Sequence, residues 1–116
     1  MAQLNEVFLM GNLSRDPRVN RMAGGSVVAN LSLALNRSFK GNDDRQREEV
    51  CFVDVTVWGK QAEWCGEALK KGSRVHVRGH LKQEGWDDKK TGEKRSKIIV
   101  EAERIQFLDR KEKVHA

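Results

Sequence analysis

The chain has 116 residues, which is enough for one domain with a single hydrophobic core and too few for two. Lys and Arg number 22 against 17 Asp and Glu, and the resulting net charge of +5 favours a polyanionic partner without identifying it. No stretch approaches the roughly 18 apolar residues of a membrane span, and the first residues do not resemble a signal peptide, so we expect a cytoplasmic protein.

The first predicted strand covers residues 5–13, where apolar positions alternate with others. One face carries Val7, Leu9, Gly11 and Leu13. Phe8 and Met10 lie on the opposite face, where a single subunit would expose them to water, so we expect a partner subunit to cover them. Turn residues at 14–17 end this strand, and paired glycines at 24–25 permit a hairpin turn after a short strand over 19–22.

A second long strand is predicted over residues 27–35, because its odd positions are all apolar and its even positions include Asn30 and Ser32. Residues 36–49 are almost wholly polar and are interpreted as a long hairpin connection. Phe39 is the only aromatic residue in this connection and has no apolar neighbours, which favours a ligand-facing role over a core role.

Residues 49–58 form a third predicted strand with two unlike faces. One face carries Cys51, Val53, Val55 and Val57 and is predicted to join the core. The other face combines Phe52 and Trp58 with Asp54 and Thr56. A polar face that displays flat apolar rings suits the stacking of planar ligands, and nucleobases are the commonest such ligands for a basic protein. The alternative is a strand that is buried on both faces or covered by a loop.

A short helix is predicted over residues 61–71, with Gly72 as its stop signal. Its apolar residues at helical spacing are Ala62, Cys65 and Leu69. Trp64 is expected to pack against the rest of the domain, because its spacing gives no reason to bind a ligand. Cys51 and Cys65 occupy apolar positions without metal-ligand spacing, so we expect both to be reduced thiols in the core.

Residues 73–82 alternate again, with apolar residues or glycine facing inward. The outward positions are Arg74, His76, Arg78, His80 and Lys82. This cationic face is a credible track for phosphates, although an exposed edge strand kept soluble by charge would show the same pattern. Residues 83–96 form a second long polar hairpin, whose only aromatic residue is Trp86. The last strand covers 97–108, where a shift of the apolar register indicates a bulge near Glu103.

These elements predict an all-β fold with one short helix: a five-stranded OB-fold, which is a Greek-key barrel, with long β-hairpin loops. Residues 1–108 would form the domain, and residues 109–116 a short charged extension that we expect to be flexible. Asp54, Asp87 and Asp88 form no metal-ligand or acid–base arrangement, and His76 and His80 lack a nucleophile partner. We therefore expect no enzyme activity, no metal site and no cofactor.

Several short strings follow one another in a specific order and spacing. They are Gly11-Asn12-Leu13 with Asp16-Pro17, Val28-Ala29-Asn30-Leu31 before Ala34-Leu35-Asn36-Arg37, Trp58-Gly59-Lys60 with Ala62-Glu63, and Leu69-Lys70-Lys71-Gly72-Ser73 before Val77 and Gly79. In this arrangement the chain resembles the bacterial-type single-stranded DNA-binding protein family over residues 4–108. The resemblance implies a homotetramer that binds and protects single-stranded DNA, with little sequence preference, during replication, recombination and repair.

The resemblance also implies roles for the aromatic residues that lack a core position. The family's base-stacking positions fall on Phe39, Phe52, Trp58 and Trp86. Phe39 and Phe52 stand where the family often has Trp, so we expect a somewhat lower affinity per base. For contacts to the phosphates we expect cationic side chains, namely Arg37, Lys40, Lys60, Arg74, Arg78 and Lys82.

Family members usually continue through a Gly/Gln/Pro-rich linker to an acidic tail with a terminal Phe. Residues 109–116 instead carry Arg110, Lys111 and Lys113 against Asp109 and Glu112. We therefore expect tail-dependent recruitment of replication and repair proteins to fail. The alternative function is a tail-less OB-fold module for replication restart, like the primosomal relatives, or for protein interaction.

Overall fold

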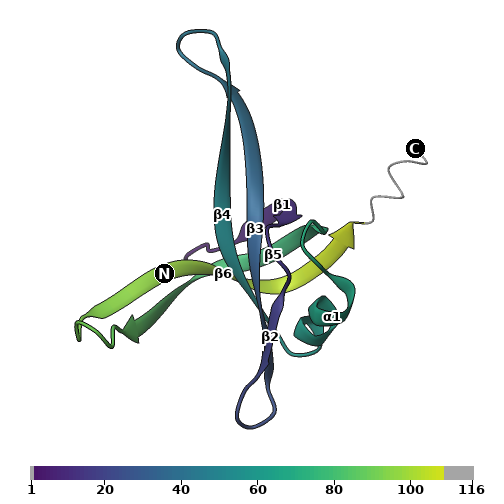
Figure 1. Cartoon of the computed structure of the whole chain (residues 1–116), viewed down its shortest axis with the longest axis vertical. Helices are drawn as coiled ribbons and strands as arrows, with labels where there is room; N and C mark the ends of the chain where they lie inside the picture. Colours follow the sequence, from purple (N-terminus) through teal and green to yellow (C-terminus); the bar gives the residue numbers. More distant parts are fainter. Residues whose placement is uncertain (1, 109–116) are drawn as a thin grey trace.

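Six strands and one helix make up the fold in the computed structural model, which describes residues 2–108; the predicted extension, residues 109–116, lies outside them. In chain order the elements are β1 (Val7–Leu13), β2 (Arg18–Arg21), β3 (Val27–Lys40), β4 (Gln46–Trp58), α1 (Lys60–Ala68), β5 (Arg74–Asp87) and β6 (Lys94–Leu108). The strands form one sheet in the order β1-β5-β6-β4-β3-β2. Pairing of β1 with β3 closes the five long strands into a barrel, as predicted, and β2 adds a short outer strand to β3 (Figure 1).

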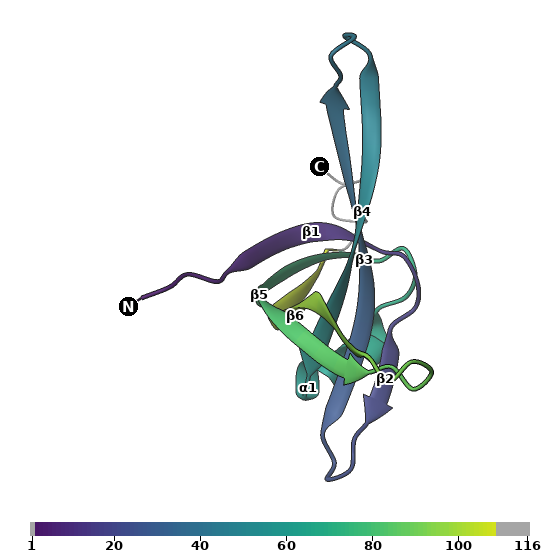
Figure 2. The same cartoon turned by 90° about the vertical axis from the view of Figure 1, so that its left-hand side faces the viewer.

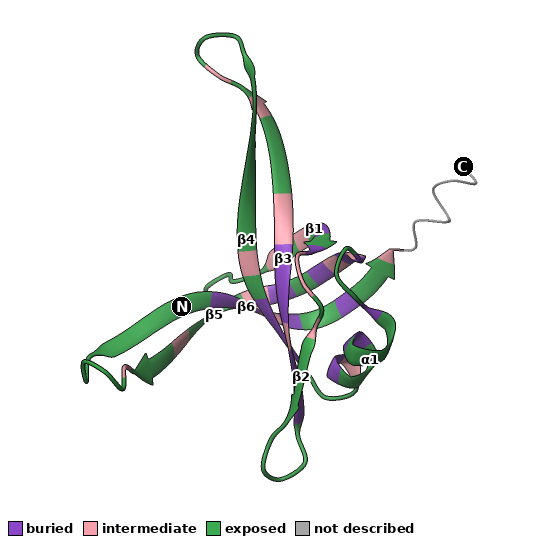
Figure 3. Ribbon diagram, viewed as in Figure 1, coloured by how far each residue is buried: buried purple, intermediate pink, exposed green. Residues whose placement is uncertain are grey.

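The core lies inside the barrel, where every second residue of each strand points inward. Its largest fully buried side chains include Leu31, Leu33, Val55, Val57, Val75 and Val77. Helix α1 covers one end of the barrel and contributes Ala62 and Cys65 to the same core. Figure 3 shows that burial is concentrated in the barrel, in α1 and in the segment that follows this helix, where Leu69 and Ser73 are buried.

A bulge in β6 keeps its apolar residues facing inward. Arg78 of β5 pairs with Arg104, whereas the next residue, Gly79, pairs with Ala102, so Glu103 has no partner in the ladder. The predicted bulge at Glu103 is therefore confirmed. Gly79 sits directly over the backbone of Glu101, where a Cβ atom would collide with the carbonyl oxygen, so the tight crossing of the two strands requires glycine.

Both segments interpreted as long loops are instead continuations of the strands. Strands β3 and β4 stay paired out to Lys40 and Gln46, and strands β5 and β6 stay paired out to Asp87 and Lys94. They project from the barrel as two twisted ribbons, β3–β4 and β5–β6 (Figure 2). Only residues 41–45 and 88–93 connect their strands. The ribbons are polar because both of their faces meet water, which removes the apolar alternation of a half-buried strand.

The helix and one cysteine also differ from the sequence expectation. Helix α1 ends at Ala68, because the next residue, Leu69, is extended, and Gly72 lies beyond it with a φ of +92°. Cys65 is buried as expected, but Cys51 is exposed. Cys51 lies where the β3–β4 ribbon leaves the barrel, so the inward-facing row of β4 reaches the core only from Val53 onward.

Candidate nucleic-acid interface

Two of the predicted stacking residues lie on the outer face of the barrel. Strand alternation places Phe52 and Trp58 on the same face of β4, with 66% and 41% of their surfaces exposed. The alternative of a strand buried on both faces or covered by a loop is thus wrong for these two rings. Between them lie Asp54, which is exposed, and Thr56, which is buried, so the two rings flank a polar row that is partly covered.

Phe39 lies on the β3–β4 ribbon, but on the opposite ribbon face from Phe52. In the register of the two strands Phe39 pairs with Arg47, five positions beyond the pair of Ala34 and Phe52. The ribbon twists between these two pairs (Figure 2). The guanidinium carbon of Arg37 lies 5.3 Å from the centre of the Phe39 ring, a cation–π distance.

Trp86 lies near the end of the other ribbon, with 46% of its surface exposed. Its partner in the ladder is Arg95, whose Nε donates a hydrogen bond of 2.9 Å to Asp88. The backbone N–H of Lys90 donates to the same carboxylate at 2.8 Å. These bonds lower the pKa of Asp88, the backbone bond first, and fix the turn beside Trp86. The predicted stacking rings are therefore spread over the barrel face and both ribbons.

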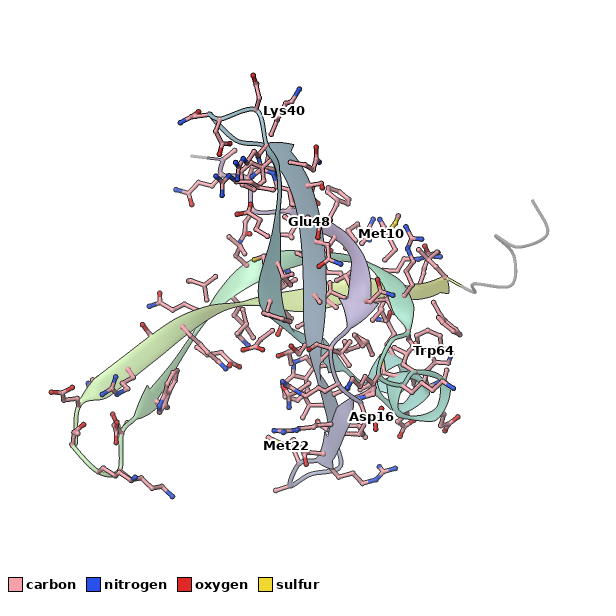
Figure 4. The ribbon with its side chains drawn as sticks, turned by 45° about the horizontal axis from the view of Figure 1, so that its top comes forward. Met10, Asp16, Met22, Lys40, Glu48 and Trp64 are labelled. Carbon is pink, nitrogen blue, oxygen red and sulfur yellow. The ribbon has the colours of Figure 1, made fainter. Side chains whose placement is uncertain are left out.

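The predicted phosphate-binding cations fall into two groups. Lys40, at the end of β3 (Figure 4), and Lys60, which follows Trp58, make no ion pair with another described residue. Each lies in a shallow surface hollow beside a predicted stacking ring, Phe39 or Trp58. Arg37 differs, because its guanidinium bonds to Glu49 at 3.2 Å while it covers Phe39.

The cationic side chains of β5 contact other residues of the protein, which the sequence alone did not indicate. Arg74 donates to the sulfur of Met10 at 3.3 Å, and Arg78 pairs across the ladder with Phe8. Both arginines therefore face the apolar side chains that a partner subunit is expected to cover. Lys82 bonds to Glu101 at 3.3 Å. The outward face of β5 is thus not one continuous cationic track.

Two carboxylates interrupt this track at its centre. Glu103 lies 2.8 Å from Nδ1 of His80, and Glu101 lies 3.1 Å from Nε2. The hydrogen bond to Glu103, with smaller contributions from Glu101, raises the pKa of His80 above its usual value of 6.5, against an opposing effect of desolvation. Neither carboxylate was predicted from the sequence, although the outward alternation of the last strand places Glu101 beside the cations of its neighbour.

A groove that was not predicted from the sequence lies on the outer face of the barrel, between the positions of Phe52 and Trp58 on β4. We call it the central groove; its polar lining includes Arg15, Arg18, Asn30, Asp54, Thr56, Glu84 and Lys97. Asp54 and Lys97, from β4 and β6, form an ion pair of 3.2 Å across its floor. The only signal in the sequence was that Asp54 and Thr56 share a face with two exposed rings.

Within residues 2–108 no three His, Cys, Asp or Glu side chains could hold a metal ion. No helix in this part of the chain is long and apolar enough to cross a membrane. What the geometry does bring together is flat rings, cations and a polar groove on the outside of a closed barrel.

Such a barrel, with one helix at its end and two projecting ribbons, is an OB-fold domain with an aromatic and cationic outer surface. The sequence model of the Single-strand binding protein family matches residues 4–108, and the chain belongs to this family. The resemblance noted in the sequence is thereby confirmed.

The chain is similar to named members of the family. It is 47% identical to the single-stranded DNA-binding protein of Wolinella succinogenes over 92% of its own length and 65% of that protein. It is 44% identical to the protein of the same name from Helicobacter hepaticus, again over 92% of its length and 62% of that protein. The chain therefore spans slightly less than two thirds of the length of these two relatives.

Solved structures agree with this assignment. A deletion mutant of the single-stranded DNA binding protein from Thermus aquaticus superposes with a TM-score of 0.82 at 36% identity, covering 92% of this chain and 51% of that one. A Plasmodium falciparum SSB in complex with single-stranded DNA superposes with a TM-score of 0.86. At 23% identity, over 94% of this chain and 98% of that one, the second likeness concerns the fold alone.

Proposed function

We propose that this chain binds single-stranded DNA with little dependence on sequence and thereby protects it during replication, recombination and repair. The observation that carries the proposal is the pair of exposed rings, Phe52 and Trp58, on the outer barrel face of a member of the Single-strand binding protein family. Every base has a π-face, so stacking on such rings tolerates any sequence. Lys40 and Lys60, which lie beside predicted stacking rings, add salt-dependent attraction for phosphates.

Intrinsic tryptophan fluorescence tests this function. Titration with oligo-dT is expected to quench the emission of Trp58 and Trp86, because a base stacks on each ring. Trp64 on α1 provides the control, since it lies on the helix and away from both ribbons (Figure 4). In the variant Trp64→Phe the quenching should persist. An emission unchanged by oligo-dT at low salt would contradict the proposal.

We also propose that the chain acts as a homotetramer. Phe8 and Met10 are 61% and 50% exposed on β1, next to one another on one face of the strand. Large apolar side chains grouped in this way favour association with another copy of the chain. Light scattering at micromolar concentration should give the mass of four chains. A monomer would refute the assembly, whereas a dimer would favour the restart-type module.

We infer further that the chain acts by binding and not by catalysis. The carboxylates Asp54 and Asp88 support this inference, because each is engaged by a cation, Lys97 or Arg95, rather than paired with another acid. Incubation with single- and double-stranded DNA tests it, since any cleavage product would contradict it.

A further inference from the structure

The central groove is large enough for one nucleobase and is lined by both signs of charge. Its volume is about 270 Å³, slightly below the range of pockets that take drug-sized ligands. Arg15, Arg18 and Lys97 supply three positive charges, and Asp54 and Glu84 supply two negative ones. A groove that served phosphates alone would gain nothing from carboxylates. The two acids therefore point to a ligand that also brings hydrogen-bond donors.

Asp54 and Lys97, which we call the floor of the groove, offer both hydrogen-bond acceptors and a donor. Oδ2 of Asp54 accepts from Nζ of Lys97 at 3.2 Å, while Oδ1 has no partner among the described residues. Both side chains are 48% exposed, so a ligand can reach them. Asp54 and Lys97 thus offer two neighbouring acceptors, Oδ1 and Oδ2, and a donor that is bonded to the second of them. A matching ligand must present donor, donor and acceptor.

Only guanine among the DNA bases has this order on its Watson–Crick edge. Its N2 and N1 carry hydrogens and its O6 is an acceptor, whereas the corresponding edge is donor–acceptor in adenine, donor–acceptor–acceptor in cytosine and acceptor–donor–acceptor in thymine. The pairing uses interactions common in base recognition, since carboxylates accept from base N–H groups and lysine donates to O6 of guanine.

The adjacent ring brings a neighbouring base to the groove. Phe52 and Asp54 are two residues apart on one strand face, a separation of about 7 Å. A base that stacks on Phe52 lies about 3.5 Å from the ring. Asp54 would meet the face of a base held there and not its edge, so the base that bonds to Asp54 is the next one of the same strand. Stacking and edge recognition then act on neighbouring bases.

Arg15 gives a second reason to expect a ligand in the groove. Its Nε atom is buried and makes no hydrogen bond to any described residue. An unpaired buried donor is costly, and a shift of the Arg15 side chain would let Nε donate to an oxygen atom of a nucleotide in the groove. Arg18 also lines the groove and adds positive charge for the phosphate that accompanies the base.

From these contacts we propose that the central groove binds one guanine in preference to the other bases. Asp54 accepts hydrogen bonds from N1 and N2 of the guanine, and Lys97 donates to O6. The proposal rests on the proposed function, because the base arrives as part of a bound single strand. Other bases still stack on the rings, so the groove adds a local preference to binding that otherwise tolerates any sequence.

The test compares oligo-dT strands of one length in which a single central thymine is replaced by guanine, hypoxanthine or adenine. A strand can slide until its one guanine reaches the groove, so its exact position matters little. Hypoxanthine keeps N1–H and O6 but lacks the N2 amino group, so it isolates the contact to Oδ1 of Asp54. We expect the guanine strand to bind about fivefold tighter than the hypoxanthine and adenine strands.

The variant Asp54→Asn replaces one acceptor by a donor and should bring the ratio of guanine to hypoxanthine binding close to one. Glu67→Gln on the exposed side of α1 removes the same charge away from the groove and should keep the wild-type ratio. Equal binding of guanine and hypoxanthine strands by the wild-type protein would overturn the proposal, whatever the variants do. Failure to bind oligo-dT itself would instead overturn the proposed function.

Discussion

Removing the ring of Phe52 should separate DNA binding from folding. About two thirds of this side chain is exposed, so the structure covers only about one third of it. Taking about 200 Å² for a Phe side chain, some 70 Å² is covered, and at about 25 cal/mol per Å² its loss costs at most about 2 kcal/mol of unfolding free energy. The lost stack on a base costs about 1–3 kcal/mol, or about 5- to 150-fold in affinity.

The assay for Phe52→Ala is a titration with oligo-dT, followed by Trp58 and Trp86 fluorescence, together with denaturant unfolding of the same sample. The opposite change, Phe52→Trp, offers a larger ring and should tighten binding. Phe107→Leu serves as the control, because Phe107 is also exposed but lies near the end of β6, outside the central groove. If Phe52→Ala unfolds more easily yet binds as tightly as the wild-type protein, the ring supports the barrel and not the DNA.

Three further predictions concern the ribbons and the charges. Trp86→Ala should weaken oligo-dT binding by about 1–3 kcal/mol, and circular dichroism should show an intact barrel, because the ring lies on a ribbon. Lys40→Ala should reduce the slope of log K against log salt by about 0.7, measured by titration at several salt concentrations. Glu103 and Glu101 raise the pKa of His80 above 6.5 in the folded protein. The stability that they add through protonated His80 is therefore complete below about pH 6.5 and is lost as pH rises through the folded-state pKa of His80. Between about pH 6 and about pH 9, the free energy of unfolding should therefore fall less in Glu103→Gln than in the wild-type protein, as measured by denaturant unfolding.

The barrel was predictable from the sequence because one face of each barrel strand is directed at the core and the other at solvent. Residues 27–35 show this alternation most clearly, and the structure places Val27, Ala29, Leu31 and Leu33 in the core, with Leu35 partly buried against it. The bulge at Glu103 was predictable for the same reason, since it shifts an apolar row by one residue. Where both faces are wet the signal disappears. The ribbons were therefore interpreted as loops, and Cys51 was assigned to a core that ends at Val53.

The exposed rings could be singled out from the sequence, but their surroundings could not. Phe52 and Trp58 were conspicuous because apolar rings shared a strand face with polar residues. The central groove combines Arg15, Asp54 and Lys97, which lie far apart in the sequence. Their proximity depends on the parallel pairing of β4 with β6, which brings Val55 opposite Val100. The alternation of apolar and polar residues along one strand does not predict which other strand it pairs with.

The two cysteines give the protein a ready position for a chemical probe. Burial raises the pKa of the Cys65 thiol to about 11, so this group stays protonated and shielded from reagents at neutral pH. Cys51 is exposed at the base of the β3–β4 ribbon. Because it precedes Phe52 and points to the other face of the strand, a maleimide dye attached there leaves the ring accessible. The unmodified sequence can thus be labelled at one position, and the dye would report on ribbon movement as a strand binds.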